Sequence, residues 1–258
     1  MPRHFVDLDG ANALPTGHFQ MTARIVADLV AHAATGVVHG PAGTGKTFAV
    51  EAALEALEAL DALPATDRPQ VCLLTFPSRP TMRMIADQLL RELTGANTPT
   101  SRNRFDLTTK LVGLLATPMR LVVVDEAQRL NGDCIELLRH LHDHPKTRFA
   151  LLYVGGDGCW EVLSKEPMLR SRVFRRLPFS PLAPAKVPAL MRRYHPIYRE
   201  AADELLVDVD NSYGHGTMRD WAVFTHTAAA LCAEQNLATV DQTTVHNAYS
   251  LLGGGLRD

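Results

Sequence analysis

The sequence predicts an α/β fold, in which a parallel sheet is flanked by helices and followed by a small domain made of helices alone. Up to about residue 180, short apolar runs alternate with helical segments, as in sheets whose parallel strands are joined by crossover helices. A glycine-rich turn lies between the first apolar run and the next helix. Beyond residue 180 the apolar runs stop, and prolines at 181, 184, 188 and 196 mark the change.

The apolar runs that we expect to form strands consist largely of Val, Leu and Phe, which suits strands buried on both faces of a sheet. They are residues 37–39, 71–76, 121–124, 149–154 and 173–179. Segments with apolar residues at helical spacing, or rich in Ala and Leu, predict helices between them. These segments are residues 19–34, 46–60, 81–93, 104–115 and 134–141. Residues 61–69 contain two prolines and are expected to form a loop.

After residue 180 only helical patterns remain. They cover residues 185–194, 198–206, 218–235 and 242–252. We therefore expect an α/β core at residues 1–180, which includes the N-terminal helix 19–34, and a helical domain at residues 181–258.

Composition limits the kind of protein. With 46% hydrophobic and 21% charged residues, the chain resembles ordinary globular proteins and not disordered or fibrous ones. Its formal net charge is -2, so contact with nucleic acid would depend on local basic patches. The four cysteines are scattered without a C-x-x-C pair, which argues against a disulfide framework or zinc site and suits a reducing cytoplasm.

Neither a membrane span nor a secretion signal is evident in the sequence. No apolar run approaches the roughly 20 residues that cross a bilayer. Residues 1–13 contain acids and lack the apolar stretch of a signal peptide. We therefore expect a cytoplasmic protein that does not enter a membrane.

The glycine-rich turn matches the phosphate-binding pattern G-x-x-x-x-G-K-[ST] between a strand and a helix. Glycines allow backbone N–H groups to surround a phosphate, and the following helix contributes its positive N-terminal dipole. Lys46 would reach the β- and γ-phosphates of ATP, and the Thr47 hydroxyl would bind Mg²⁺. We expect the nucleotide to be held by Gly40, Pro41, Ala42, Gly43, Thr44, Gly45, Lys46, Thr47 and Phe48.

Two acids, Asp125 and Glu126, follow the apolar run 121–124. They are expected at the C-terminal end of a strand, where open α/β sheets bind ligands. Asp125 would hold Mg²⁺ together with Thr47, and Glu126 would polarise the attacking water. Acids also cap strands in proteins without catalysis, but their position about 80 residues after the glycine-rich loop favours ATP hydrolysis.

The order of these motifs resembles AAA+ ATPases, which implies an AAA+ type P-loop NTPase with a C-terminal helical lid domain. Two further motifs contribute to the resemblance, Met168-Leu169-Arg170-Ser171-Arg172-Val173 and Gly216-Thr217-Met218-Arg219. The resemblance implies that Arg172, with Arg170 as second candidate, is a finger entering the ATP site of a neighbouring subunit. It also implies that Arg219 opens a lid helix and faces the γ-phosphate.

Each arginine has an ordinary alternative. Arg172 could belong to a surface basic cluster, because Arg175 and Arg176 follow, and Arg219 could be an ordinary arginine at a helix start. The chain departs from the family pattern at residues 154–157, Val-Gly-Gly-Asp. Many AAA+ proteins have a polar sensor residue there, at the end of the fourth strand, so this position remains unassigned.

Within AAA+ proteins, residues 76–82, residues 125–130 and the short lid resemble the transposition-regulator group (MuB-, TniB- and TnsC-like). The similarity covers about residues 18–235. It implies a homo-oligomer, ring or helical filament, that assembles with ATP on double-stranded DNA without much sequence preference. It also implies that this assembly recruits or activates a transposase and disassembles on hydrolysis.

Two polar clusters are candidates for phosphate contacts with DNA. They consist of Ser78, Arg79, Thr81 and Arg83, and of Arg102, Arg104 and Lys110. Each could equally be a solvated surface. Two other functions therefore stay open, an ExeA-like or signalling AAA+ ATPase without DNA binding, and a nucleotide-gated adaptor with incidental hydrolysis.

Overall fold

The structure is a computed structural model that describes residues 8–59, 69–76, 79–95 and 104–253. Two compact units make up the chain, and each is described separately. One contains residues 20–40 and 46–179, and the other contains the described residues up to Phe19, residues 41–45 and those from Ser180 onward.

A five-stranded parallel sheet forms the centre of the first unit, with the strand order β2-β3-β4-β1-β5. Its strands are β1 (Thr35–His39), β2 (Gln70–Leu74), β3 (Arg120–Val124), β4 (Phe149–Gly155) and β5 (Val173–Pro178). Every residue of β3 and β4 is buried, and apart from Arg120 at the start of β3 and Gly155 at the end of β4 these residues are apolar, as expected for strands covered on both faces. The predicted α/β fold with a parallel sheet is confirmed.

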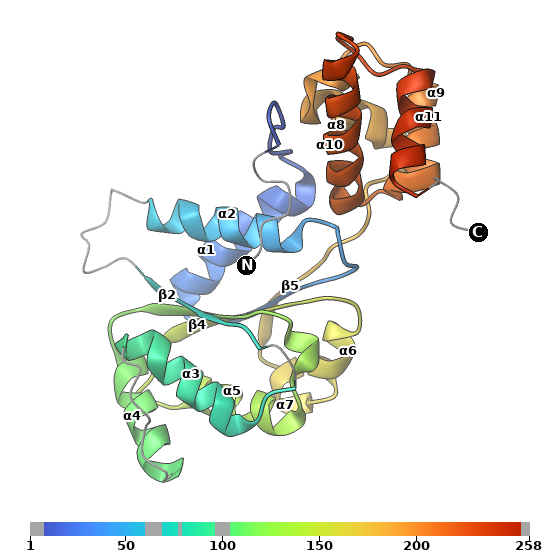
Figure 1. Cartoon of the computed structure of the whole chain (residues 1–258). Coiled ribbons are helices and arrows are strands. Elements are labelled where there is room, and N and C mark those ends of the chain that lie inside the picture. The colour runs from blue at the N-terminus through green and yellow to red at the C-terminus, as the bar shows by residue number, and fades with distance from the viewer. Residues whose placement is uncertain (1–7, 60–68, 77–78, 96–103, 254–258) are drawn as a thin grey trace. The chain divides into compact units, whose positions relative to one another are not determined.

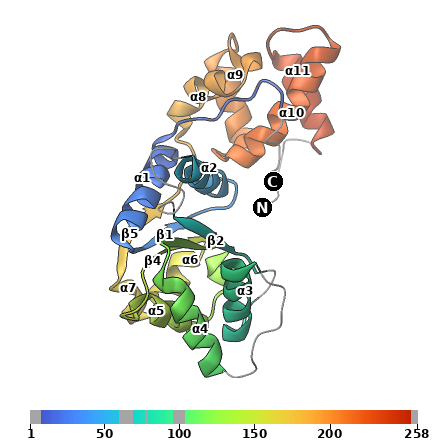
Figure 2. The same cartoon turned by 90° about the vertical axis from the view of Figure 1, so that its left-hand side faces the viewer.

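Helices cover both faces of this sheet. One face carries α1 (Gly17–His32) and α2 (Lys46–Glu58) (Figure 1). The opposite face carries a larger set, which packs with the sheet into one apolar core (Figure 2). This set comprises α3 (Met82–Thr94), α4 (Arg104–Ala116), α5 (Gly132–Asp143), α6 (Cys159–Ser164) and α7 (Pro167–Arg170).

Several helices begin where a polar side chain caps them. The capping oxygens of Thr81, Asn131, Thr217 and Asp241 accept the backbone N–H groups of Met84, Cys134, Asp220 and Thr244. Such caps satisfy N–H groups that have no partner within the helix. They explain why α3, α5, α10 (Met218–Glu234) and α11 (Gln242–Leu251) start at these residues.

The second unit is helical, with α8 (Val187–Tyr194) and α9 (Asp203–Val209) preceding α10 and α11. Figure 2 shows these four helices grouped together. Their buried side chains form one apolar core that includes several aromatic residues. In it the ring centroid of Trp221 lies 5.7 Å from that of Tyr198 and 6.1 Å from that of Phe224. Such edge-to-face contacts add to the stabilisation from burial. None of the helices described is both long enough and apolar enough to cross a membrane.

The elements differ from the prediction in several places, of which the short helices α6 and α7 and the start of α9 are the clearest. Helices α6 and α7 were not predicted, because six and four residues are too few to display a helical period. Helix α9 begins at Asp203 instead of residue 198, after a 3₁₀ turn at Pro196–Tyr198. Its first turn contains Asp203 and Glu204, which favour a helix N-terminus there. Most of the predicted loop 61–69 lies outside the described residues.

The N-terminal segment packs on the helical unit, whereas the sequence analysis placed it with the core. The Asn12 backbone N–H donates to the Tyr194 carbonyl at 2.8 Å, and Leu14 is buried in the helical core. The His195 ring accepts the Ile197 N–H at Nδ1, so its Nε2 donates to the Asp9 carbonyl at 2.8 Å. A domain boundary near residue 180 stays a prediction.

Asp210, which is buried in the helical unit, holds the turn before α10. Its Oδ1 atom accepts the Trp221 indole N–H and the Gly216 backbone N–H, both at 2.8 Å. A Cβ atom at Gly214 would lie 2.4 Å from the Trp221 Nε1 atom, so the turn leaves no room for a side chain there. Asp210 thereby orients the segment that leads into Arg219.

We predict that Asp210→Ala lowers the free energy of unfolding by roughly 2–4 kcal/mol, because two buried donors lose their acceptor. Urea unfolding of the full chain measures this change. Asp210→Asn keeps an oxygen acceptor and should lose less. The matched control is Asp208→Ala, an exposed acid of α9. A loss for Asp210→Ala no larger than that of this control would contradict the assignment.

Candidate functional site

The glycine-rich loop leaves β1 in a conformation that suits only glycine. Gly40, Gly43 and Gly45 have φ values of 143°, 79° and 89°, in the region that side chains disfavour. A Cβ atom at Gly40 would lie 2.3 Å from the Phe179 carbonyl oxygen. The loop therefore brings bare backbone to the C-terminal end of β1, as a phosphate cradle requires.

Within the helical unit, the loop residue Gly43 contacts the start of α10. The Gly43 carbonyl accepts the Arg219 backbone N–H at 3.0 Å. A Cβ atom at Gly43 would approach the Cβ atoms of Thr217 and Arg219 to 3.3 Å. The loop is closed internally, since the Thr44 hydroxyl donates to the Pro41 carbonyl at 2.9 Å. The structure thus brings together two motifs singled out in the sequence, and the Arg219 side chain is exposed.

Lys46, Thr47 and Phe48 form the first turn of α2. The Lys46 residue is only 8% exposed, although it carries a charge, whereas Phe48 is 42% exposed. Thr47 is half-buried. A nearly buried lysine at a helix N-terminus adds positive charge where backbone N–H groups already favour an anion.

Asp125 lies directly after β3 and is 8% exposed. Its backbone N–H donates to the Leu74 carbonyl at 2.9 Å, which continues the β2–β3 pairing. Burial raises the pKa of the Asp125 carboxyl, and the positive charge of Lys46 opposes this rise. An acid in such surroundings is poised to bind a cation.

Glu126 has φ 54°, which is uncommon for a residue with a side chain. Its Oε2 atom accepts the Gln128 side-chain amide at 2.8 Å and lies 3.2 Å from an Arg129 nitrogen. The other end of the amide, Gln128 Oε1, accepts the Gly156 backbone N–H at 2.9 Å. Sequence reasoning missed Gln128 and Arg129 as site residues, because only the fold brings Gly156 to the same place.

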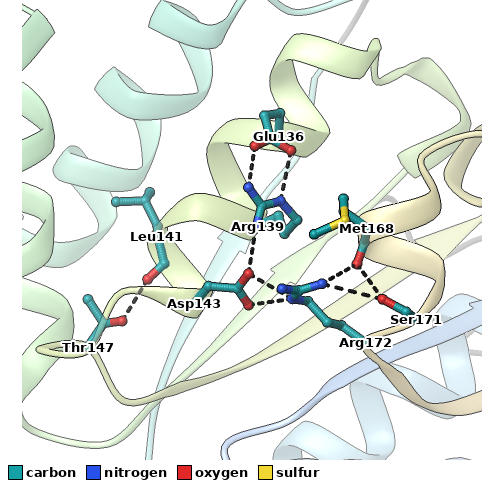
Figure 3. A network of polar contacts seen from close by, with 8 residues as sticks. All are labelled: Glu136, Arg139, Leu141, Asp143, Thr147, Met168, Ser171 and Arg172. Carbon is teal, nitrogen blue, oxygen red and sulfur yellow. Dashed lines mark hydrogen bonds and ion pairs between the residues drawn. The ribbon is translucent and has the colours of Figure 1, made fainter.

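Arg172, the first candidate for the finger, is held by its own chain. Its Nε atom lies 2.7 Å from Asp143 Oδ2, and its Nη1 donates to the Met168 carbonyl at 2.8 Å. Figure 3 shows that Asp143 also contacts Arg139, which in turn pairs with Glu136. The side chain of the second candidate, Arg170, is exposed.

The two neighbouring arginines are engaged elsewhere. Arg175 pairs with Asp28 at 2.9 Å, and the Arg176 guanidinium lies 4.5 Å from the centre of the Trp160 ring. These contacts separate Arg175 and Arg176 from the network around Arg172. The finger role of Arg170 or Arg172 stays a prediction.

The predicted DNA contacts are only partly described. Arg79, Thr81, Arg83 and Lys110 are exposed. Arg83 pairs with Asp87 at 3.3 Å, and the Thr81 hydroxyl caps α3. Ser78, Arg102 and the side chain of Arg104 lie outside the described residues.

The residues present fit a nucleoside triphosphate with Mg²⁺. The loop has no room for a side chain at Gly40, a nearly buried lysine follows it, and an acid with a raised pKa stands within electrostatic reach of that lysine. Mg²⁺ commonly binds through one or two carboxylates together with substrate phosphates. Across the described residues, no group of three or more His, Cys, Asp or Glu side chains forms a separate metal site.

A family model for the AAA domain matches residues 30–163, which is more than half of the chain. The chain belongs to the AAA-domain family. No curated protein matches this AAA-domain chain in sequence. The predicted AAA+ type of fold is confirmed, and nucleotide binding is supported with it.

Solved structures agree with the family. The Cdc6p protein of Pyrobaculum aerophilum has a TM-score of 0.70 at 15% identity, over 96% of this chain and 70% of that one. The Aeropyrum pernix ORC2 protein, solved as ADPNP-ADP complexes, has a TM-score of 0.65 at 17% identity, over 95% and 70%. The Aeropyrum pernix ORC1 protein, solved in complex with DNA, has a TM-score of 0.65 at 19% identity, over 96% and 68%. At these identities the likeness shows the fold alone.

We predict that Asp125→Asn stabilises the protein in the absence of nucleotide while it removes Mg²⁺-dependent activity. An acid whose pKa is raised by folding destabilises the folded state once it ionises. The neutral amide avoids this penalty, so the melting temperature should rise at neutral pH, and the gain should shrink as acid protonates Asp125. The exposed Asp157, changed to Asn, is the control and should show no gain. A lower melting temperature for Asp125→Asn at neutral pH would contradict the prediction.

Proposed function

We propose that this AAA-domain chain is a Mg²⁺-dependent ATPase that assembles in several copies on double-stranded DNA and regulates a transposase. The observation that carries the ATPase part is that Gly40 at the end of β1 and the nearly buried Lys46 at the start of α2 share one compact unit with Asp125 and Glu126, which follow β3. We place the protein in the cytoplasm.

In this proposal each residue has a distinct task. Lys46 and the backbone of residues 40–45 hold the triphosphate, and Arg219 reaches it from the start of α10. Thr47 and Asp125 would hold Mg²⁺, which neutralises charge on the phosphates when it is bound. Glu126 orients the attacking water and accepts its proton.

The active site is proposed to be completed by a neighbouring subunit. An arginine that stabilises the charge of the transition state can raise the rate by about 10³–10⁵. Arg170 is exposed and available to a second subunit. Arg172 would have to exchange Asp143 of its own chain for a phosphate of the neighbour.

We predict complementation between two inactive variants. Lys46→Ala disables the ATP site but leaves the arginines, and Arg172→Ala does the opposite. Each alone should lose ATP turnover, and their mixture should regain part of it, because a variant with an intact site then meets an intact finger. Arg170→Ala is tested in the same way and identifies which arginine acts.

The complementation is measured as phosphate release at constant total protein. Turnover per subunit of the unchanged protein should also fall on dilution. If the mixture stays inactive for both arginines, and turnover per subunit is flat on dilution, the shared site is wrong. If Lys46→Ala alone retains normal ATP affinity and turnover, the nucleotide site itself is wrong.

DNA binding is proposed for the loop after β2 and the start of α3. Arg79 and Arg83 are exposed, and they repeat along one channel when subunits assemble around DNA. A repeated basic surface can attract phosphates although the formal net charge of the chain is -2. The resemblance to transposition regulators supports this, as does the DNA complex of the structurally similar ORC1 protein.

We predict that Arg79→Ala and Arg83→Ala weaken binding to random duplex DNA in the presence of a non-hydrolysable ATP analogue. Each substitution should reduce the slope of log affinity against log salt by about one. Gel shift at several salt concentrations measures both effects. Arg91→Ala, an exposed arginine in the last turn of α3, is the matched control. Unchanged binding in the loop variants would exclude this surface, and no binding by the unchanged protein would favour an ATPase without DNA binding.

A further inference from the structure

Gln128 holds the carboxylate of Glu126 from within the same turn. It lies in the 3₁₀ turn Ala127–Arg129, which follows the two acids after β3. Its Nε2 atom donates to Glu126 Oε2 at 2.8 Å, while its Oε1 atom accepts the Gly156 N–H at 2.9 Å. Because both ends of the amide are bound, a flip would set an oxygen against the carboxylate. The orientation of the amide is therefore determined by its partners.

The end of β4 is shaped to receive this glutamine. A Cβ atom at Gly155 would lie 2.6 Å from Gln128 Oε1, and one at Gly156 would lie 3.3 Å from Gln128 Nε2. The space that a side chain at residue 155 would need is thus taken by the amide of Gln128 together with Cys159, whose Sγ atom would lie 2.5 Å from that Cβ atom. This accounts for the glycine at residue 155, in the region where no polar sensor residue could be assigned from the sequence.

Arg129 also contacts Glu126, but this ion pair is weakened by its exposure to solvent. The Arg129 Nη2 atom lies 3.2 Å from Glu126 Oε2, and both side chains are 39% exposed, so solvent screens the pair. The Nη1 atom of Arg129 donates to the Phe76 carbonyl at 2.7 Å. Gln128 is therefore the better fixed of the two partners of Glu126.

We propose that Gln128 is a positioning residue for Glu126, aligned by the Gly156 backbone N–H at the end of β4. Gln128 lies in the turn after β3 and provides a polar side chain beside the end of β4, where the chain itself has only glycines. Gln128 acts only through the direction of the Glu126 carboxylate. The inference rests on the proposed ATPase function.

The test measures ATP turnover of the full chain with saturating DNA and Mg²⁺. Gln128→Ala should lower kcat by about tenfold to a hundredfold, as expected when a catalytic group loses its alignment, and should leave KM for ATP within about twofold. Gln128→Glu keeps the size of the side chain but sets a like charge against Glu126, and should lower kcat further. Gln88→Ala, a half-buried glutamine of α3, is the matched control and should retain full turnover.

A double variant separates positioning from a structural role. In the Glu126→Gln background, Gln128→Ala should cause no further loss, because its effect passes through the carboxylate. An additional loss in that background, a matching loss of ATP affinity, or a Gln128→Ala rate equal to that of the unchanged protein would overturn the proposal. The last outcome leaves the ATPase function intact. Absence of turnover in the unchanged protein would instead overturn that function, and this inference with it.

Discussion

The candidate site depends on the absence of a side chain at residue 40. The Phe179 N–H, which follows β5, donates to the carbonyl of His39, the last residue of β1, at 2.6 Å. This contact presses the Phe179 carbonyl against the loop, to within 2.3 Å of where a Cβ atom at Gly40 would stand. Only glycine fits at residue 40, where φ is 143° and the Phe179 carbonyl occupies the space of a side chain.

Burial of a charged group is the constraint on Asp125. Strand β3 is buried along its whole length, so the residue that follows it is drawn into surroundings where a charge is unfavourable. Burial raises the pKa of Asp125, and Lys46 offsets only part of that rise. The fold thus contains a carboxyl group whose ionised form is unfavourable unless a cation lies beside it. This is a common exchange of stability for function at binding sites.

The helices and strands could be predicted from the sequence better than the contacts between residues that lie far apart in it. Strand burial and helical periodicity are local, and so are the glycine-rich loop and the two acids after β3. The partners of the site are not local: Gln128 meets Gly156 28 residues away, and Arg172 meets Asp143 29 residues away. The contacts of residues 8–16 with the helical unit are also not local, since the Asn12 backbone N–H donates to the Tyr194 carbonyl and Leu14 is buried in the helical core. The regulation of a transposase stays a prediction, since relatives below 20% identity show the fold alone.

The contacts of Arg172 within its own chain determine how easily its side chain could leave Asp143 for another partner. Glu136, Arg139, Asp143 and Arg172 form a line of two acids and two bases (Figure 3). If Arg172 moved away, Asp143 would keep Arg139, so no acid would be left without a cation. The side chains of Arg172 and Asp143 are 34% and 28% exposed, and pairs with such access to water contribute about 1 kcal/mol or less. Asp143 therefore orients the Arg172 side chain in this structure. In the proposed function, a contact this weak could be exchanged for one with a more highly charged phosphate group.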